Sequence, residues 1–148
     1  MALYSHILLA VDFHAETPLI VERARAMQEA YKTKLSLVHV IEPIGIAYGG
    51  EFPLDLGDLH RELEKQGREK LAELGQQLGV PAEQQLLEVG ITEREILRVA
   101  KEQAIDLIVL GSHGRHGLAL LLGSTANAVL HRSQCDVLAV RVGKQKSA

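Results

Sequence analysis

Apolar residues occur in five short runs along the chain, and these runs alternate with stretches in which apolar residues recur every three or four positions. A short, unbroken apolar run indicates a buried strand, whereas the wider spacing indicates the inner face of a helix. The runs predict strands at 7–11, 34–41, 84–89, 106–110 and 137–142. The spaced positions predict helices that begin near residues 17, 59, 92 and 124.

Residue types at three of the expected helix starts support these limits. Thr17-Pro18 is typical of an N-cap followed by the first helical residue. Thr92-Glu93-Arg94-Glu95 has the pattern of a capping box with Thr92 as the N-cap. Ser124 or Thr125 is expected to cap the last helix.

Alternating strands and helices predict an α/β fold: a doubly wound, Rossmann-like, five-stranded parallel sheet with helices on both faces. The runs 7–11 and 106–110 are the most purely apolar, so we expect them at the centre of the sheet. They are neighbours in the strand order 3-2-1-4-5, and their carboxyl ends mark the topological switch point where such sheets bind ligands. Asp12 follows one of these strands and Gly111 follows the other.

Length and composition narrow the class of protein. The 148 residues suit one domain, expected over residues 1–143 with a frayed tail at 144–148. Sixteen Lys and Arg against 19 Asp and Glu give a net charge of −3, and only 3% of residues are aromatic, which argues against a nucleic-acid partner. No apolar run is long enough to suggest a membrane partner. Cys135 is the only cysteine, which favours a cytoplasmic location.

The stretch 106–125 has the strongest chemical pattern in the chain. A buried strand is followed by Gly111, Gly114 and Gly117, and then by Gly123-Ser124-Thr125 at a helix start. Glycine lets the backbone approach a ligand closely, and a helix start presents free N–H groups at its positive end. This arrangement suits a phosphate group. The alternative is that the glycines only form tight turns.

The whole chain resembles the universal stress protein family. The resemblance rests on five sequence segments: ILLAVD at 7–12, SLVHV at 36–40, Val89-Gly90 followed by Ile96 and Ala100, DLIVLGSHGRHG at 106–117, and GSTANAVL at 123–130. It implies an α/β domain of the doubly wound type that usually dimerises. It also implies that an adenine nucleotide, ATP or AMP, binds at the switch point, as in many members of the family.

One spacing departs from the family pattern. The nucleotide-binding branch has Gly, two residues, Gly, nine residues, and then Gly-Ser or Gly-Thr. Gly111, Gly114 and Gly123-Ser124 match, but eight residues separate Gly114 from Gly123, as in a branch that does not bind ATP. Gly117 offers backbone freedom that could absorb the difference. Nucleotide binding is the favoured interpretation, and a ligand-free dimeric interaction module is the alternative.

Carried over by position, the resemblance implies a site built from two strand ends, the glycine loop and the following helix start. Its residues are Ala10, Val11, Asp12, Val40, Leu110, Gly111, His113, Gly114, Arg115, Gly123, Ser124 and Thr125. Ala10, Val11 and Val40 would lie near the adenine. Asp12 would hold the ribose hydroxyls or a nucleotide-bound Mg²⁺. The loop and residues 123–125 would form two walls around the phosphates.

The residues do not favour a dedicated enzyme, and we assign no catalytic residue. A Walker-type ATPase needs a lysine beside its phosphate loop, and GSHGRHG has none. A dinucleotide oxidoreductase needs its glycine fingerprint after the first strand, where this chain has Asp12-Phe13-His14. Very slow ATP hydrolysis stays open because His113 and Arg115 could support a developing charge. His113 and His116 alone make a weak metal pair.

The last expected strand bears on assembly. Val137, Leu138, Ala139, Val140, Arg141 and Val142 form an edge strand in the order 3-2-1-4-5, interrupted by a single charge. An unprotected apolar edge invites pairing with another chain. We therefore expect a homodimer in which the two edges pair antiparallel about a two-fold axis. The alternative is a monomer in which the tail or the 42–57 loop covers this edge.

Overall fold

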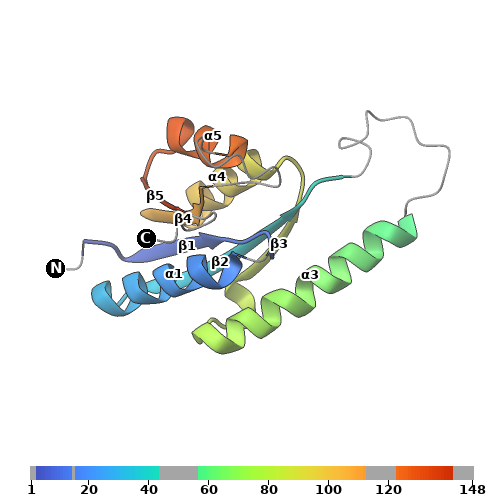
Figure 1. Ribbon diagram of the computed structural model, residues 1–148, viewed down its shortest axis with the longest axis horizontal. Helices are drawn as coiled ribbons and strands as arrows, with labels where there is room; N and C mark the ends of the chain where they lie inside the picture. Colours follow the sequence, from blue (N-terminus) through green and yellow to red (C-terminus); the bar gives the residue numbers. More distant parts are fainter. Residues whose placement is uncertain (1–2, 15, 44–56, 113–122, 142–148) are drawn as a thin grey trace, which may run out of the picture.

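The computed structural model describes residues 3–14, 16–43, 57–112 and 123–141. Within them, five strands and four α-helices alternate along the chain, with one short 3₁₀ helix before the third strand (Figure 1). The elements are β1 (His6–Ala10), α1 (Thr17–Tyr31), β2 (Lys34–Ile41), α3 (Gly57–Leu78), η1 (Ala82–Gln84), β3 (Gln85–Val89), α4 (Thr92–Glu102), β4 (Leu107–Gly111), α5 (Ser124–Arg132) and β5 (Asp136–Val140).

The strands form one parallel sheet in the order β3-β2-β1-β4-β5, which confirms the predicted fold class and strand order. β1 lies between β2 and β4, with Ile7 opposite both Leu35 and Leu107. Ile7, Leu8 and Leu9 have no exposed surface. Strands covered on both faces are apolar at every position, and this is why these runs were recognisable as central strands.

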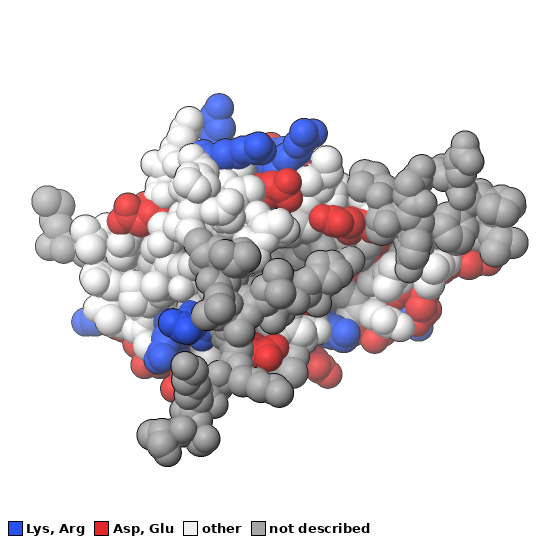
Figure 2. Space-filling model, turned by 45° about the horizontal axis from the view of Figure 1, so that its top comes forward, with Lys and Arg blue, Asp and Glu red and all other residues white. Residues whose placement is uncertain are grey.

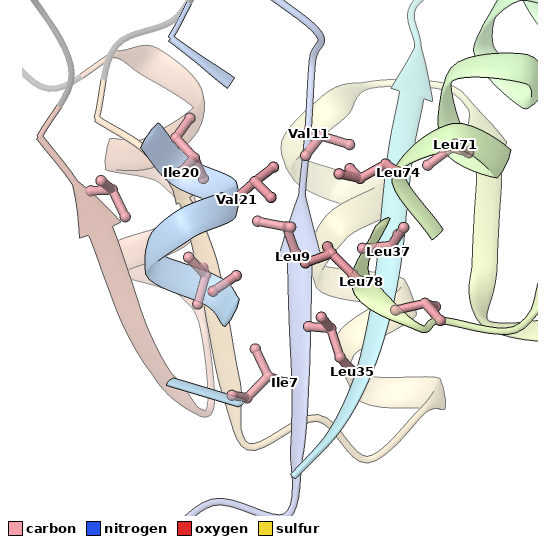
Figure 3. Close-up of a cluster of buried hydrophobic side chains, with 14 of the residues drawn as sticks. Ile7, Leu9, Val11, Ile20, Val21, Leu35, Leu37, Leu71, Leu74 and Leu78 are labelled. Atoms are coloured by element: carbon pink, nitrogen blue, oxygen red, sulfur yellow. The ribbon is translucent and has the colours of Figure 1, made fainter. Parts of the chain in front are cut away.

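Two helices cover each face of the sheet. α1 and α3 pack on one face, and α4 and α5 pack on the other (Figure 1). Because successive strand residues point to opposite faces, Leu9 contacts the α1 and α3 layer while Leu8 contacts the α4 and α5 layer. Figure 3 shows the first layer, where Leu9 lies between Val21 of α1 and Leu78 of α3.

Gly67 lies in the middle of α3 where this helix meets the sheet. A Cβ atom at this position would lie 3.1 Å from Leu87 Cδ1 and 3.3 Å from His39 Cδ2. Glycine in a helix interior lowers helix stability. Here it allows the helix backbone to approach β2 and β3, so packing outweighs intrinsic propensity.

The expected capping box of α4 is wrong. Ile91 is the N-cap, and Thr92 is the first helical residue. The Thr92 hydroxyl donates to Glu42 Oε1 at 2.9 Å, and Glu95 binds Arg98 (Nε to Oε2, 3.0 Å) instead of reaching back to the cap. The carboxylate that meets the start of α4 therefore comes from the end of β2, fifty residues earlier in the chain.

The other two expected N-caps are also wrong. α1 begins at Thr17, and Glu16 is its N-cap. Thr17 Oγ1 instead accepts a hydrogen bond from the His14 N–H at 2.8 Å. α5 begins at Ser124 with Gly123 as N-cap, and no side chain of the described residues caps its first turn.

No helix in the described part of the chain is long and apolar enough to cross a membrane. Figure 2 shows basic side chains gathered along the upper edge of one face, with acidic side chains next to them and elsewhere on the same face. This agrees with the nearly balanced charge of the sequence.

Candidate functional site

The carboxyl ends of β1 and β4 lie side by side at the centre of the sheet. The two strands are parallel and hydrogen-bonded neighbours, with Leu9 opposite Val109. After β1 the chain turns to α1 on one face of the sheet, whereas α5, the next described helix after β4, lies on the other face (Figure 1). This is the switch point of a doubly wound sheet, where ligands bind in folds of this type.

Three of the residues expected near the adenine lie at this end of β1 and β2. Ala10 is half-buried, and Val11 and Val40 are buried. The Val11 N–H donates to the carbonyl oxygen of Val38 at 2.9 Å, which extends the pairing of β1 and β2 beyond Ala10. Asp12 comes next and leaves 46% of its side chain exposed, so its carboxylate is accessible.

At the end of β4, Leu110 is buried and Gly111 is partly exposed. Ser112, which we did not predict, is buried at this point. Its N–H donates to the carbonyl oxygen of Val140 at 2.8 Å, and its carbonyl oxygen accepts from the Gly123 N–H at 2.5 Å. Ser112 therefore joins the end of β4 to the start of α5 and brings Gly111 and Gly123 into the same region.

The start of α5 contributes backbone N–H groups to this region. The first bond within the helix runs from the Asn127 N–H to the carbonyl oxygen of Gly123 at 2.9 Å. The amides of Ser124, Thr125 and Ala126 precede it and have no acceptor within the helix. Uncapped amides at the positive end of a helix suit an anionic group. Ser124 is exposed and Thr125 is half-buried.

Three predicted loop residues, His113, Gly114 and Arg115, lie outside the described residues, as does His116. Their roles remain predictions. Among the described residues, no group of three or more His, Cys, Asp or Glu side chains is arranged to hold a metal ion. Mg²⁺ commonly binds through one or two carboxylates plus substrate phosphates, so Asp12 suits an ion that arrives with a nucleotide.

The turn after β1 is held by contacts from β2 and α3. Phe13 has a φ of 53°, in the left-handed region that non-glycine residues rarely adopt. Its ring packs at a steep angle against the ring of His39, with 4.9 Å between the centroids, and Lys70 Nζ lies 5.7 Å from the Phe13 centroid. His39 Nδ1 lies 2.8 Å from the carbonyl oxygen of Val11, so this histidine binds the backbone at the end of β1.

His14 lies between two carboxylates in the same turn, and the sequence analysis missed it. Its Nε2 is 2.8 Å from Asp12 Oδ1, and its Nδ1 is 2.8 Å from Glu16 Oε2. The one signal in the sequence is spacing, because the carboxylates stand two residues before and two residues after the histidine. That spacing has no fixed meaning in a loop, where the backbone conformation decides which side chains meet.

A groove of about 380 Å³ lies at the opposite end of the sheet, where α4 leads into β4 and α5 leads into β5. Leu97 and Ile105 contribute apolar surface to it, and Lys101 and Arg132 line it as well. It is found at the amino ends of the strands and does not include the switch point. The candidate nucleotide site is therefore separate from this groove.

The model of the universal stress protein family matches residues 3–141 of the chain. A relative from Coxiella burnetii (strain RSA 493 / Nine Mile phase I), Universal stress protein A homolog 1, is 42% identical over 138 residues, covering 93% of this chain and 96% of the relative. The match therefore extends over nearly the whole of both proteins.

Solved structures agree with this assignment. The hypothetical protein MJ0577 superposes with a TM-score of 0.78 at 27% identity and covers 96% of this chain and 99% of its own. A universal stress protein in complex with cAMP superposes with a TM-score of 0.60 at 24% identity and covers 93% and 96%. Sequence match, strand order and fold agree over the same residues, and the chain belongs to the universal stress protein family.

Proposed function

We propose that this protein binds an adenine nucleotide, ATP or AMP, at the carboxyl ends of β1 and β4 and acts as a regulatory or signalling module in the stress response. The observation that carries the proposal is the convergence of three features at one switch point. These are the exposed carboxylate of Asp12, the end of β4 at Gly111, and the first turn of α5, which no side chain of the described residues caps.

Each feature suits a different part of a nucleotide. A carboxylate accepts hydrogen bonds from ribose hydroxyls or binds a nucleotide-bound Mg²⁺, which is the role we propose for Asp12. The N–H groups of Ser124 and Thr125 suit the phosphates, together with the loop residues His113, Gly114 and Arg115. Ala10, Val11, Val40 and Leu110 would provide an apolar boundary for the adenine.

Comparison with relatives supports this choice of ligand. Membership of the universal stress protein family is established over residues 3–141. One protein with the same fold was solved in complex with cAMP, which is itself an adenine nucleotide. Nucleotide binding by this chain is thus the first activity to test.

Isothermal titration of nucleotide-stripped protein with ATP and Mg²⁺, and separately with AMP, provides the test. We expect binding by the unmodified protein and a loss of about 1–3 kcal/mol, roughly five- to 150-fold in affinity, for Asp12→Ala. Asp58→Ala is a matched control, because this exposed aspartate lies on α3 and pairs with Arg61 on the same helix. No heat of binding from the unmodified protein would refute the proposal.

The rival function is a ligand-free interaction module. A nucleotide that co-purifies with the protein would distinguish the two, because the chain contains no Trp and excess absorbance at 260 nm would be easy to detect. Protein that lacks bound nucleotide and gives no heat with ATP or AMP would support the rival.

We also propose that the protein has no committed catalytic activity. The phosphate loop lacks a lysine, and residues 111–125 contain no carboxylate or glutamine side chain that would orient an attacking water. Steady-state hydrolysis of ATP should stay below about 1 s⁻¹, the low end of ordinary enzyme turnover. Faster turnover that falls in His113→Ala or Arg115→Ala would contradict this expectation.

We propose that the protein forms a homodimer joined through β5. We also propose that it is located in the cytoplasm. β5 is an edge strand of the sheet. The carbonyl oxygen of Val140 accepts a hydrogen bond from the Ser112 N–H, so the backbone groups of Val140 face β4. Since backbone groups of successive strand residues face opposite sides, those of Val137 and Ala139 face away from β4. Arg141 follows β5, and Val142 lies outside the described residues.

A further inference from the structure

We propose that His14 is a positioning residue that holds the Asp12 carboxylate ready to accept hydrogen bonds from the ribose hydroxyls of the nucleotide. His14 would then determine how strongly the site selects a ribose over a sugar that lacks these hydroxyls. The inference rests on the proposed nucleotide site and assigns a role to a residue outside the set predicted from the sequence.

The contact between the two side chains has the geometry that this role requires. His14 Nε2 lies 2.8 Å from Asp12 Oδ1, a distance typical of a hydrogen bond to a charged acceptor. An N–H on Nε2 donates to Oδ1 and restrains the carboxylate. Because a carboxylate has two oxygens with several lone pairs, the other oxygen stays able to accept from a ligand.

His14 is itself fixed more firmly than Asp12. Its backbone N–H donates to Thr17 Oγ1 at 2.8 Å, and its carbonyl oxygen accepts from the Thr17 N–H at 3.0 Å. Its Nδ1 accepts a hydrogen bond from the Glu16 backbone N–H at 3.1 Å and lies 2.8 Å from Glu16 Oε2, so both ring nitrogens have partners. His14 leaves 29% of its side chain exposed, against 46% for Asp12.

The intervening residue fixes the turn that brings the two side chains together. Phe13 has a φ of 53°, and its ring packs against the His39 ring, with Lys70 Nζ 5.7 Å from its centroid. An unusual backbone conformation of this kind persists only where surrounding contacts determine it. Asp12 is thus ordered before the ligand arrives, and a group already ordered loses less conformational freedom on binding.

The experiment compares the affinities of two nucleotides, ATP and 2′,3′-dideoxy-ATP, by isothermal titration. We expect His14→Ala to weaken ATP binding by about two- to tenfold, the cost of ordering one side chain on binding, while 2′,3′-dideoxy-ATP binding changes little. The preference for ATP should therefore decrease. His14→Gln, which keeps a donor near the position of Nε2, should retain most of this preference.

Two further variants control for folding and for surface charge. His14→Leu removes the donor but keeps side-chain volume, and it replaces His14→Ala if thermal unfolding shows that the alanine variant does not fold. His131→Ala removes an exposed histidine from α5 and should leave both affinities unchanged.

The outcomes separate this inference from the proposed function. Unmodified protein that fails to bind ATP refutes the nucleotide site and the inference with it. If ATP binds and Asp12→Ala weakens it, but His14→Ala leaves the preference for ATP unchanged, only the inference fails. Equal weakening of both nucleotides would also overturn it, and so would tighter ATP binding by His14→Ala, which would identify His14 as a competitor for Asp12.

Discussion

His6 is a buried histidine at the amino end of the sheet, and both of its ring nitrogens have partners. Nε2 lies 2.8 Å from Ser36 Oγ, and Nδ1 lies 3.2 Å from the carbonyl oxygen of Gln103. This set suits the neutral ring, with Nδ1 as donor and Nε2 as acceptor from the serine hydroxyl. Burial, together with the nearby charge of Lys34, lowers the pKa of His6 below its ordinary value of 6.5.

The lowered pKa makes stability depend on pH in a defined window. Above pH 6.5, His6 makes its full contribution to the free energy of unfolding. This contribution is lost as the pH falls from 6.5 through the folded-state pKa, because in this range the unfolded chain binds a proton at His6 more readily than the folded chain does. His6→Gln should reduce the slope of unfolding free energy against pH by up to about 1.4 kcal/mol per pH unit. Urea unfolding between pH 5 and 8 measures it.

His131→Gln is the matched control, since His131 is exposed on α5. It should leave the slope unchanged, and identical slopes for His6→Gln and the unmodified protein would contradict the prediction.

The contribution of Asp106 to the free energy of unfolding depends on pH in a separate and lower pH window. Burial acts against its ionisation, but hydrogen bonds from Ser5 and His6 outweigh burial and lower the pKa of Asp106, so its contribution is lost only as the pH falls below about 3.9.

At the scale of one element, the end of α3 is packed so closely that it requires a glycine. A Cβ on Gly75 would lie 2.9 Å from the carbonyl oxygen of Val80. That oxygen accepts a hydrogen bond from Gln85 Nε2 at 2.9 Å, while the Val80 N–H donates to the carbonyl oxygen of Gly75 at 2.8 Å. These bonds join the helix to the turn before β3, and the added Cβ would also overlap Gln85 Nε2, so both the Gln85 side chain and the turn would have to move.

Gly75→Ala should therefore destabilise the protein, although alanine favours helix more than glycine does. We expect a loss of about 1–3 kcal/mol, the range found for overpacked positions. Gln76→Ala, an exposed neighbour on the same helix, should change stability by less than about 0.5 kcal/mol. Urea unfolding of both variants provides the measurement. A more stable Gly75→Ala variant would show that the turn after α3 adjusts freely.

At the scale of the whole molecule, the proposed dimer depends on β5, the edge strand of the sheet. The side chain of Val140 is 4% exposed and belongs to the core, so a substitution there would disturb folding as well as any interface. Ala139 is the better position for a test, since its N–H faces away from β4. Proline at an outward-facing edge position removes a donor to a partner strand without removing a bond to β4.

Light scattering at micromolar concentration should give a mass of twice 16.2 kDa for the unmodified protein. Ala139→Pro should shift this mass toward that of a single chain, because the pairing of two edges loses a backbone donor from each. Ala139→Val keeps the N–H and should remain dimeric. A mass near 16.2 kDa for the unmodified protein would rule out the dimer.

The central strands could be recognised from the sequence alone because burial on both faces leaves a continuous apolar run. Both limits of β2, Lys34–Ile41, match the prediction. The strand order followed from placing the two purest runs at the centre, and the switch point followed from the strand order. The positions of Asp12 and Gly111 at the strand ends therefore needed no tertiary information.

Which residues contact one another was decided only by the tertiary structure. Thr92 has a capping-box pattern, yet its partner is Glu42, and Gly67 is explained by the approach of α3 to His39 and Leu87. The meeting of His14 with Asp12 depends on the left-handed turn at Phe13. Hydrophobic periodicity records whether a residue faces the core, and this is a property of single positions. Backbone geometry and packing determine which polar groups form pairs, and both exist only once the chain has folded.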